Sequence, residues 1–159
     1  MKLDIGIHPN NTRSVVQILS SLLADEYILY TKTRNAHWNV DGPDFYAMHK
    51  FFEAQYETID ATIDDVAERI RSLGHFAPAT LKEFIELTHL TEKPRTKNDR
   101  ISFMYIKELL GDHESIINSL RDAILKVGND YKDLGTSDFM TSLMEQHEKM
   151  AWMLRMHLN

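Results

Sequence analysis

DFYAMHKFFEAQYETIDATIDDVAERIRSLG, residues 44–74, contains no proline, and its only glycine is the last residue. The backbone chemistry therefore allows one unbroken α-helix here. At about 100° per residue, one stripe of this helix carries histidine and acidic side chains and the adjacent stripe is apolar. The first stripe contains His49, Glu53, Asp64 and Glu68, and the second contains Phe45, Phe52, Tyr56, Ile59, Ile63, Val66 and Ile70. Such a border is half-buried in a helix bundle, where a cation would compensate unpaired carboxylates.

The spacing of the polar stripe predicts a site shared between two chains. At about 1.5 Å of rise per residue, Glu53 and Asp64 lie about 16 Å apart, so one helix cannot close a metal site around both. The residue numbers of His49 and Glu68 add up to 117, as do those of Glu53 and Asp64. An identical helix packed antiparallel about a two-fold axis near residues 58 and 59 therefore completes two equivalent sites. Any one acid pair taken alone is better explained as helix-surface decoration, and it is the symmetric spacing of the two pairs that favours a site.

A second histidine, His37, precedes Asn39-Val40-Asp41-Gly42-Pro43, which is typical of a tight turn between two helices. A helical hairpin with this turn brings His37 back against the next helix, close to His49. A lone histidine is more often a capping or core residue, so the metal interpretation depends on these neighbours. Imidazole and carboxylate ligands suit Fe(II) and Fe(III), although zinc or manganese could occupy the same set.

The run ADEYILYTKTRNAHWNVDGPDFYAMHKFFEAQYETIDATIDDVAERIRSLG, from residue 24, resembles the Dps family, the mini-ferritins. The resemblance resumes at DLGTSDFMTSLMEQHEKMAWMLRMHL, from residue 133, and covers nearly the whole chain from about Ile5 to Leu158. In the family, the ferroxidase ligands are a His in a His-Trp-Asn pattern, a second His, two further acids and a Glu in an Ala-Glu-Arg pattern. At the matching positions this chain has His37, His49, Glu53, Asp64 and Glu68. Glu53 stands where many members have Asp, which keeps the carboxylate and lengthens its reach by one methylene.

The resemblance implies a ferroxidase and an iron store. Fe(II) would bind at the dimer interface and be oxidised by hydrogen peroxide, the preferred oxidant, or by dioxygen. The ferric product would be stored as a mineral inside a hollow twelve-subunit shell, and the cell would be protected against oxidative stress.

Three further residues have two interpretations each. We expect Trp38 to be a packing residue beside the turn, although beside a redox metal it could also donate an electron and intercept radicals. Asp133 and Asp138 match the part of the family that lines acidic entry pores, so they are candidates for guiding Fe(II) inward. A helix cap and a solvated loop would explain the two aspartates equally well.

Composition excludes several classes of function. With 159 residues, 43% hydrophobic and 26% charged, the chain is expected to form one domain over residues 1–159. It has no cysteine, which excludes disulfides and thiol catalysis and fits a cytoplasmic protein. Residues 1–10 contain no apolar run of signal-peptide length, so we expect neither export nor membrane insertion. The net charge of −6 and the lack of a basic tail argue against direct DNA binding. A DNA-compacting protein is therefore only an alternative hypothesis. A metal-sequestering bundle without turnover is a second alternative.

The remaining pattern predicts an all-α, ferritin-like four-helix bundle with a short extra helix in a long crossover between helices two and three. We expect the first helix to be capped by Asn10, Asn11 or Thr12 and to end near Trp38, and the second to end at a Gly74 cap. The extra helix is expected at about 79–87, the third helix from Asn98 or Asp99 to about Gly128, and the fourth from a Thr136 or Ser137 cap to the C-terminus. The expected inward residues of the third helix are Ile101, Met104, Leu109, Ile116, Ile117, Leu120 and Ile124.

A di-iron centre inside one chain is the weaker hypothesis. The Glu-x-x-His pattern that such bundles use twice occurs only once, at Glu86 and His89, and it lies in the crossover. The last helix offers Glu145, His147 and Glu148, which do not reproduce it. We therefore interpret His113 and His147 as structural.

Overall fold

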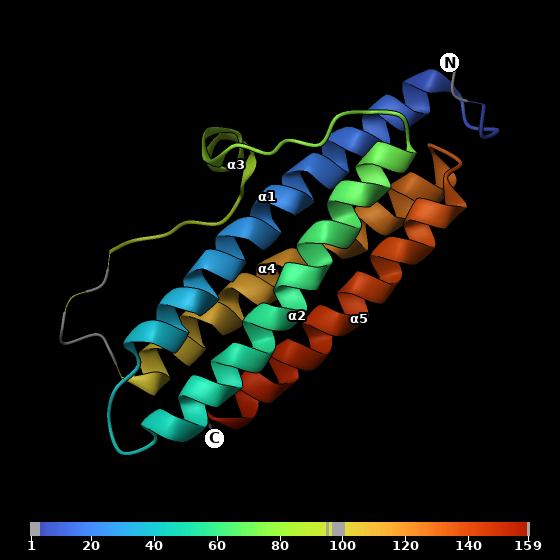
Figure 1. The fold of residues 1–159 in the computed structure, drawn as a ribbon. Coiled ribbons are helices and arrows are strands. Elements are labelled where there is room, and N and C mark those ends of the chain that lie inside the picture. The colour runs from blue at the N-terminus through green and yellow to red at the C-terminus, as the bar shows by residue number, and fades with distance from the viewer. Residues whose placement is uncertain (1–3, 95, 97–100, 159) are drawn as a thin grey trace.

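Four long helices lie side by side as two antiparallel hairpins, α1 with α2 and α4 with α5 (Figure 1). The computed structural model describes residues 4–94, 96 and 101–158. The helices are α1 (Pro9–Asn39), α2 (Phe45–Ser72), α3 (Leu81–Leu87), α4 (Ser102–Asn129) and α5 (Leu134–Met156). Within these described ranges there is no β-strand. The predicted all-α bundle with a short helix in its crossover is confirmed.

The crossover from α2 to α4 runs along the bundle and places α3 against α1 (Figure 1). Two buried charged residues of α1 hold this connection. The Asp25 carboxylate accepts hydrogen bonds from the Thr88 hydroxyl at 2.7 Å and the His89 backbone N–H at 2.6 Å. The Lys32 ammonium donates to the Thr91 carbonyl at 2.8 Å. Because buried charges are costly without partners, these contacts hold residues 88–91 of the crossover against α1.

The predicted cap of α1 is wrong. The helix begins at Pro9, and the cap is His8, whose Nδ1 accepts a hydrogen bond from the Asn10 N–H at 3.2 Å. Proline suits the first helical position because its missing N–H would have no partner there. Asn10, Asn11 and Thr12 therefore lie inside the first turn.

The predicted cap of the last helix is also wrong. Asp133 caps α5, because its carboxylate accepts the Thr136 N–H at 2.9 Å, which places Thr136 and Ser137 inside the helix. At the other end of the bundle, α4 begins at Ser102. The predicted caps Asn98 and Asp99 lie outside the described residues. Gly74 does end α2, as predicted, with a φ of 85° that favours glycine.

The core lies along the facing sides of the four long helices. Predicted core residues such as Phe52, Ile59 and Leu120 are fully buried. Phe45, Ile101 and Met104 are exposed instead, because they lie at helix starts or one position away from the inward stripe of α4. That stripe is formed by Tyr105, Ile106, Leu109, Leu110, His113, Ile116 and Leu120. Among the described helices none is long and apolar enough to cross a membrane.

Candidate metal site

His37 and His49 stack on each other where α1 and α2 meet. His37 lies in the last turn of α1 and is buried, whereas His49 lies in the second turn of α2 and is half-buried. Their ring centroids are 3.8 Å apart and the planes are inclined by 21°. Each Nδ1 lies 2.8 Å from the backbone carbonyl oxygen of the other residue. The hairpin prediction that placed the two histidines together is therefore confirmed.

This reciprocal arrangement fixes the chemistry of both rings. A carbonyl oxygen can only accept, so each Nδ1 carries the proton and donates it. In the neutral ring, the Nε2 atoms of His37 and His49 then carry a lone pair that is available for a metal. Metal-binding histidines in general are oriented by such a hydrogen bond from the second ring nitrogen.

Glu53 lies one turn beyond His49 on α2 and is paired with a cation of its own chain. The Lys50 ammonium lies 2.5 Å from the Glu53 carboxylate. This hydrogen bond, together with the positive charge of Lys50, lowers the pKa of Glu53. The carboxylate therefore stays ionised and ready to bind a metal. The sequence analysis did not identify Lys50, although its place three residues before Glu53 is typical of a helix-surface ion pair.

Asp64 and Glu68 are exposed on the far half of α2. Within the described part of the chain, no group of three or more His, Asp or Glu side chains is close enough to hold a metal ion. The five predicted ligands therefore fall into a histidine half, formed by His37, His49 and Glu53, and an acidic half, formed by Asp64 and Glu68. One chain brings together only the two histidines, as the helix spacing requires.

Trp38 is not packed in the core of its own chain. Within a single chain, the interpretation of Trp38 as a packing residue is therefore wrong. It is 63% exposed. The guanidinium carbon of Arg34 lies 4.9 Å from the centroid of its ring and 4.6 Å from that of Tyr56. Tyr56 in turn meets the ring of His37 edge-on at 5.2 Å. The sequence analysis missed Arg34, for which the only signal was its position four residues before Trp38 on the same helix face.

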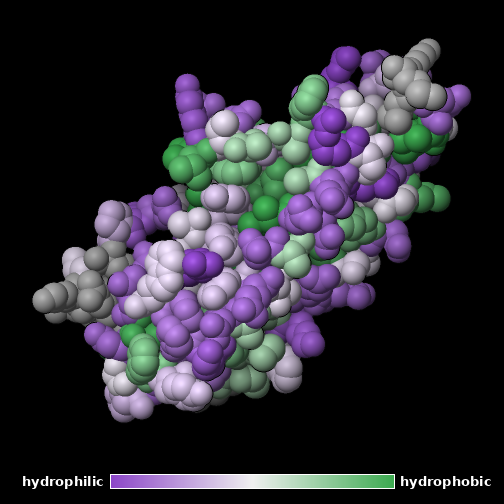
Figure 2. All heavy atoms as spheres, in the orientation of Figure 1, coloured by the Kyte–Doolittle hydropathy of each residue, from purple (hydrophilic) through white to green (hydrophobic). Residues whose placement is uncertain are grey.

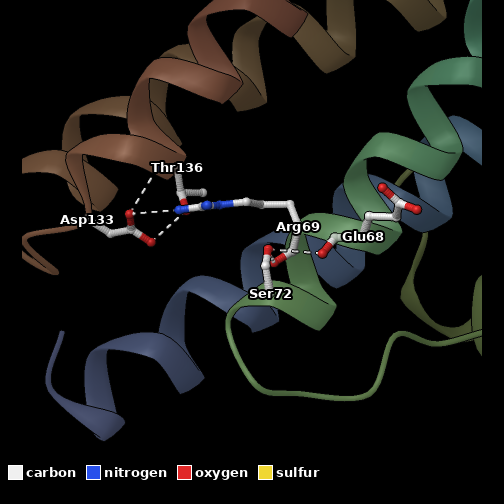
Figure 3. Close-up of polar contacts among 5 residues, drawn as sticks. All are labelled: Glu68, Arg69, Ser72, Asp133 and Thr136. Atoms are coloured by element: carbon white, nitrogen blue, oxygen red, sulfur yellow. Dashed lines mark hydrogen bonds and ion pairs between the residues drawn. The ribbon is translucent and has the colours of Figure 1, made fainter. Parts of the chain in front are cut away.

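Asp133 is not available to line a pore. It is 2% exposed, caps α5, and pairs with Arg69 at 3.2 Å. Figure 3 shows the Arg69 side chain reaching from α2 to Asp133 and Thr136, whereas the neighbouring Glu68 points the other way. This contact holds the last turns of α2, which carry Glu68, against the start of α5. Asp138 is exposed, and its role at a pore stays a prediction.

A second histidine pair lies in the centre of the bundle. His113 of α4 and His147 of α5 are fully buried, with their Nδ1 atoms 2.9 Å apart. The Nε2 of His147 lies 2.7 Å from the carboxylate of buried Glu26 on α1. Burial and the neighbouring His147 hold the pKa of His113 well below its usual value. These contacts join three helices, which agrees with a structural role for His113 and His147.

The Glu-x-x-His pattern of the crossover forms no metal pair. Glu86 lies in α3 and faces Lys82 at 3.8 Å, whereas His89 follows the helix and lies against Asp25 at 3.1 Å. The two side chains thus serve different local contacts. The weaker hypothesis of a di-iron centre inside one chain gains nothing from them.

Comparison with known proteins gives a consistent result. Residues 16–159 match the family model described as a ferritin-like domain. The chain is 38% identical to an uncharacterized low temperature-induced protein of Nostoc, over 97% of this chain and 85% of that protein. It is 36% identical to the DNA protection during starvation protein of Helicobacter pylori, over 89% and 96%. The Dps protein of Vibrio cholerae O1, titled a member of a superfamily of ferritin-like diiron-carboxylate proteins, has a similar structure with a TM-score of 0.91 at 25% identity, covering 100% of this chain and 98% of that one.

Proposed function

This chain belongs to the Dps family of ferritin-like proteins, and we propose that it oxidises Fe(II) at sites shared between two subunits and stores the ferric product. The ligands are the histidine half of one subunit, His37, His49 and Glu53, and the acidic half of its partner, Asp64 and Glu68. The subunits assemble as two-fold dimers within a dodecameric shell. Fe(II) is the substrate and the mineral is the cargo.

The observation that carries this proposal is the reciprocal hydrogen bonding of His37 and His49. In the neutral rings it leaves the Nε2 lone pairs of both histidines free, while Glu53 is paired with Lys50 and no group of three metal-type side chains forms within the described chain. Two neutral donors need carboxylates to compensate a divalent or trivalent cation. The antiparallel pairing of α2 with a second copy supplies Asp64 and Glu68 at the matching level.

Hydrogen peroxide is the proposed oxidant, and dioxygen is the alternative. Two Fe(II) ions give up one electron each to one peroxide molecule, which takes up two protons and leaves as two molecules of water. Because both electrons go to the same peroxide, no hydroxyl radical is released. Trp38, next to His37 and largely exposed in one chain, is placed to donate an electron if only one iron is bound. Zinc or manganese in the same ligand set would block this turnover.

Protection of DNA, which the name of the Helicobacter relative states for that protein, does not require contact with DNA. Removing Fe(II) and peroxide together would suffice. The net charge of −6 disfavours attraction to phosphate, so direct binding is not part of the proposal. A protein that only sequesters metal is the remaining alternative, and it would bind Fe(II) without consuming peroxide.

Complementation between two inactive variants tests the shared site. The first variant is His37→Ala/His49→Ala and the second is Asp64→Ala/Glu68→Ala. In a heterodimer, one site loses every exchanged ligand and the other keeps the full set. We expect each variant alone to be inactive in anaerobic Fe(II) oxidation by peroxide, followed by absorbance, and the reassembled mixture to recover activity. Verified heterodimers without recovery would contradict the shared site, and Fe(II) binding without peroxide consumption by the wild type would favour sequestration.

A further inference from the structure

An apolar groove of about 290 Å³ lies between α1, α2 and α3. We call it the α3 groove, and its main lining residues are Leu23, Tyr27, Ile63, Ala67, Leu81 and Phe84. Figure 2 shows hydrophobic surface gathered beside α3 on this side of the molecule. Its floor is aromatic, since Phe84 stacks on Tyr27 with ring centroids 4.4 Å apart. Leu81 at the rim is 65% exposed, so the groove is open to a partner.

Trp38 is an apolar side chain beside the metal site that its own chain leaves uncovered. It follows the ligand His37 directly, yet 63% of it is exposed. Its ring leans back along α1 over Arg34, whose guanidinium carbon is 4.9 Å from the ring centroid. This is the normal direction of a helical side chain, toward the helix N-terminus. The indole therefore occupies the level of Arg34 along α1.

The contacts between α1 and α2 show which residue of α2 lies beside the indole along the helix axis. His37 stacks on His49, and Tyr30 meets Tyr56 edge-on at 6.0 Å, so each step forward along α1 corresponds to one step back along α2. Arg34, and with it the indole, is level with Phe52.

The two-fold axis that completes the metal site then fixes what faces the indole. Antiparallel pairing centred between residues 58 and 59 sets the level of Phe52 opposite the partner's Asp65. That level lies midway between Ile63 and Ala67, the two α2 residues that line the α3 groove. The position of the two-fold axis follows from His49, Glu53, Asp64 and Glu68 alone. That it also brings the indole to the level of the α3 groove is therefore an independent observation.

We infer that Trp38 of each subunit inserts into the α3 groove of its partner. The occupant is a second copy of this chain, because the same symmetry operation that joins the two halves of the metal site brings an exposed indole to an open apolar groove with aromatic walls. A tryptophan side chain buries about 150–250 Å² when covered, and aromatic neighbours prefer such edge or offset contacts. Since Trp38 adjoins His37, this contact fixes the histidine half of the site against the acidic half of the partner. The inference rests on the shared site proposed above.

Cross-linking is a direct test, because the natural chain contains no cysteine. The variant Trp38→Cys/Leu81→Cys is treated with a short bifunctional thiol reagent. Within one chain the groove residues Tyr27 and Leu23 lie about 16–22 Å from Trp38 along α1, so a short link must join two subunits. We expect a covalent dimer from this variant and not from either single-cysteine variant. The control Trp38→Cys/Leu125→Cys uses a leucine of α4 that is equally exposed, at 67%, and lies outside the groove.

Fluorescence tests the same contact with the indole present. In a Trp152→Phe chain, Trp38 is the remaining tryptophan. We expect its emission in the assembled protein to be blue-shifted and shielded from acrylamide. Leu81→Glu should shift the emission to the red and expose the indole, whereas Leu125→Glu should change neither property.

The outcomes separate this inference from the proposed function. A Trp38 that is fully accessible to acrylamide in the assembled protein, or a cross-link no stronger than in the Leu125 control, would overturn the docking. If peroxide-dependent Fe(II) oxidation persists in that case, the shared site stands without it. If the cross-link forms but the wild-type protein does not oxidise Fe(II), the docking stands and the ferroxidase proposal fails.

Discussion

The two histidine pairs of this molecule differ in what happens to their ring nitrogens. In the pair of His37 and His49, each Nδ1 donates to a backbone carbonyl, which in the neutral ring leaves each Nε2 with a free lone pair. In the pair of His113 and His147, the Nδ1 atoms bind each other and one Nε2 binds Glu26 in the closed core. The remaining Nε2, that of His113, is buried without a partner in the structure. The first pair has lone pairs available to a ligand, whereas the hydrogen bonds of the second pair connect α1, α4 and α5.

This difference shows that residue type alone does not make a metal site in a helix bundle. Both pairs are imidazoles in contact with each other, and both have a carboxylate nearby. Access separates them: the outer pair lies on the border of α2, where His49 is half-buried, and in our proposal a second subunit supplies its carboxylates. The inner pair already has Glu26 and lies among fully buried residues.

The largest expected effect separates the two pairs by activity. His49→Ala removes a ligand and should slow peroxide-dependent Fe(II) oxidation at low iron-to-protein ratios by more than about tenfold, since even partners of ligands contribute that much. His113→Gln should leave the rate per assembled subunit unchanged within about twofold, because no reacting atom lies near it. Stopped-flow absorbance on size-selected assemblies measures both. Equal losses of oxidation rate in the two variants would contradict the distinction between a metal-binding and a structural histidine pair.

The outer pair could be predicted from the sequence because it follows from local rules. The turn at residues 39–43 and the unbroken helix after it place His37 beside His49 without any knowledge of the rest of the fold. The proposed division of the ligands between two subunits was also drawn from the sequence, from helix rise and the symmetric spacing of the four α2 residues.

The errors arose where tertiary contacts or single side chains decide. The sequence offers several good caps in a row before α5, and the choice of Asp133 depends on its ion pair with Arg69 across the bundle. That same pairing removes Asp133 from the pore hypothesis. Glu26 was missed because it has no acidic or histidine neighbour three or four residues away on α1, and its partner His147 is 121 residues away. Trp38 was expected to pack, but it is largely exposed in its own chain.

A second prediction compares the carboxylates that belong to the two pairs. Glu68→Gln should slow Fe(II) oxidation by about tenfold or more by removing a charged ligand, yet leave the metal-free protein as stable as wild type or slightly more so, because repulsion with Glu53 and Asp64 is relieved. Glu26→Ala should behave in the opposite way. It leaves a buried histidine nitrogen unpaired and should cost about 1–3 kcal/mol of stability, with little change in the oxidation rate of folded protein.

Denaturant unfolding of the metal-free proteins and stopped-flow oxidation decide this second comparison. A Glu68→Gln variant that oxidises Fe(II) at the wild-type rate would remove Glu68 from the site. A silent Glu26→Ala would show that the inner chain of hydrogen bonds does not stabilise the bundle.

The smallest expected effect is the acid response of the inner pair. The pKa of His113 is lower in the folded protein than in the unfolded chain, because burial and His147 disfavour its charged form. Below the ordinary histidine pKa of about 6.5, the unfolded chain therefore binds a proton that the folded protein does not, and stability falls as the pH is lowered. Each such proton is worth at most about 1.4 kcal/mol per pH unit.

His113→Gln should remove this contribution between about pH 6.5 and 5, so its free energy of unfolding should fall less steeply than that of wild type. His157→Gln, which replaces an exposed histidine at the end of α5, is the control and should keep the wild-type slope. Urea unfolding at one protein concentration across this pH range measures the slopes, and identical slopes for wild type and His113→Gln would mean that His113 takes up its proton in the core as readily as in water.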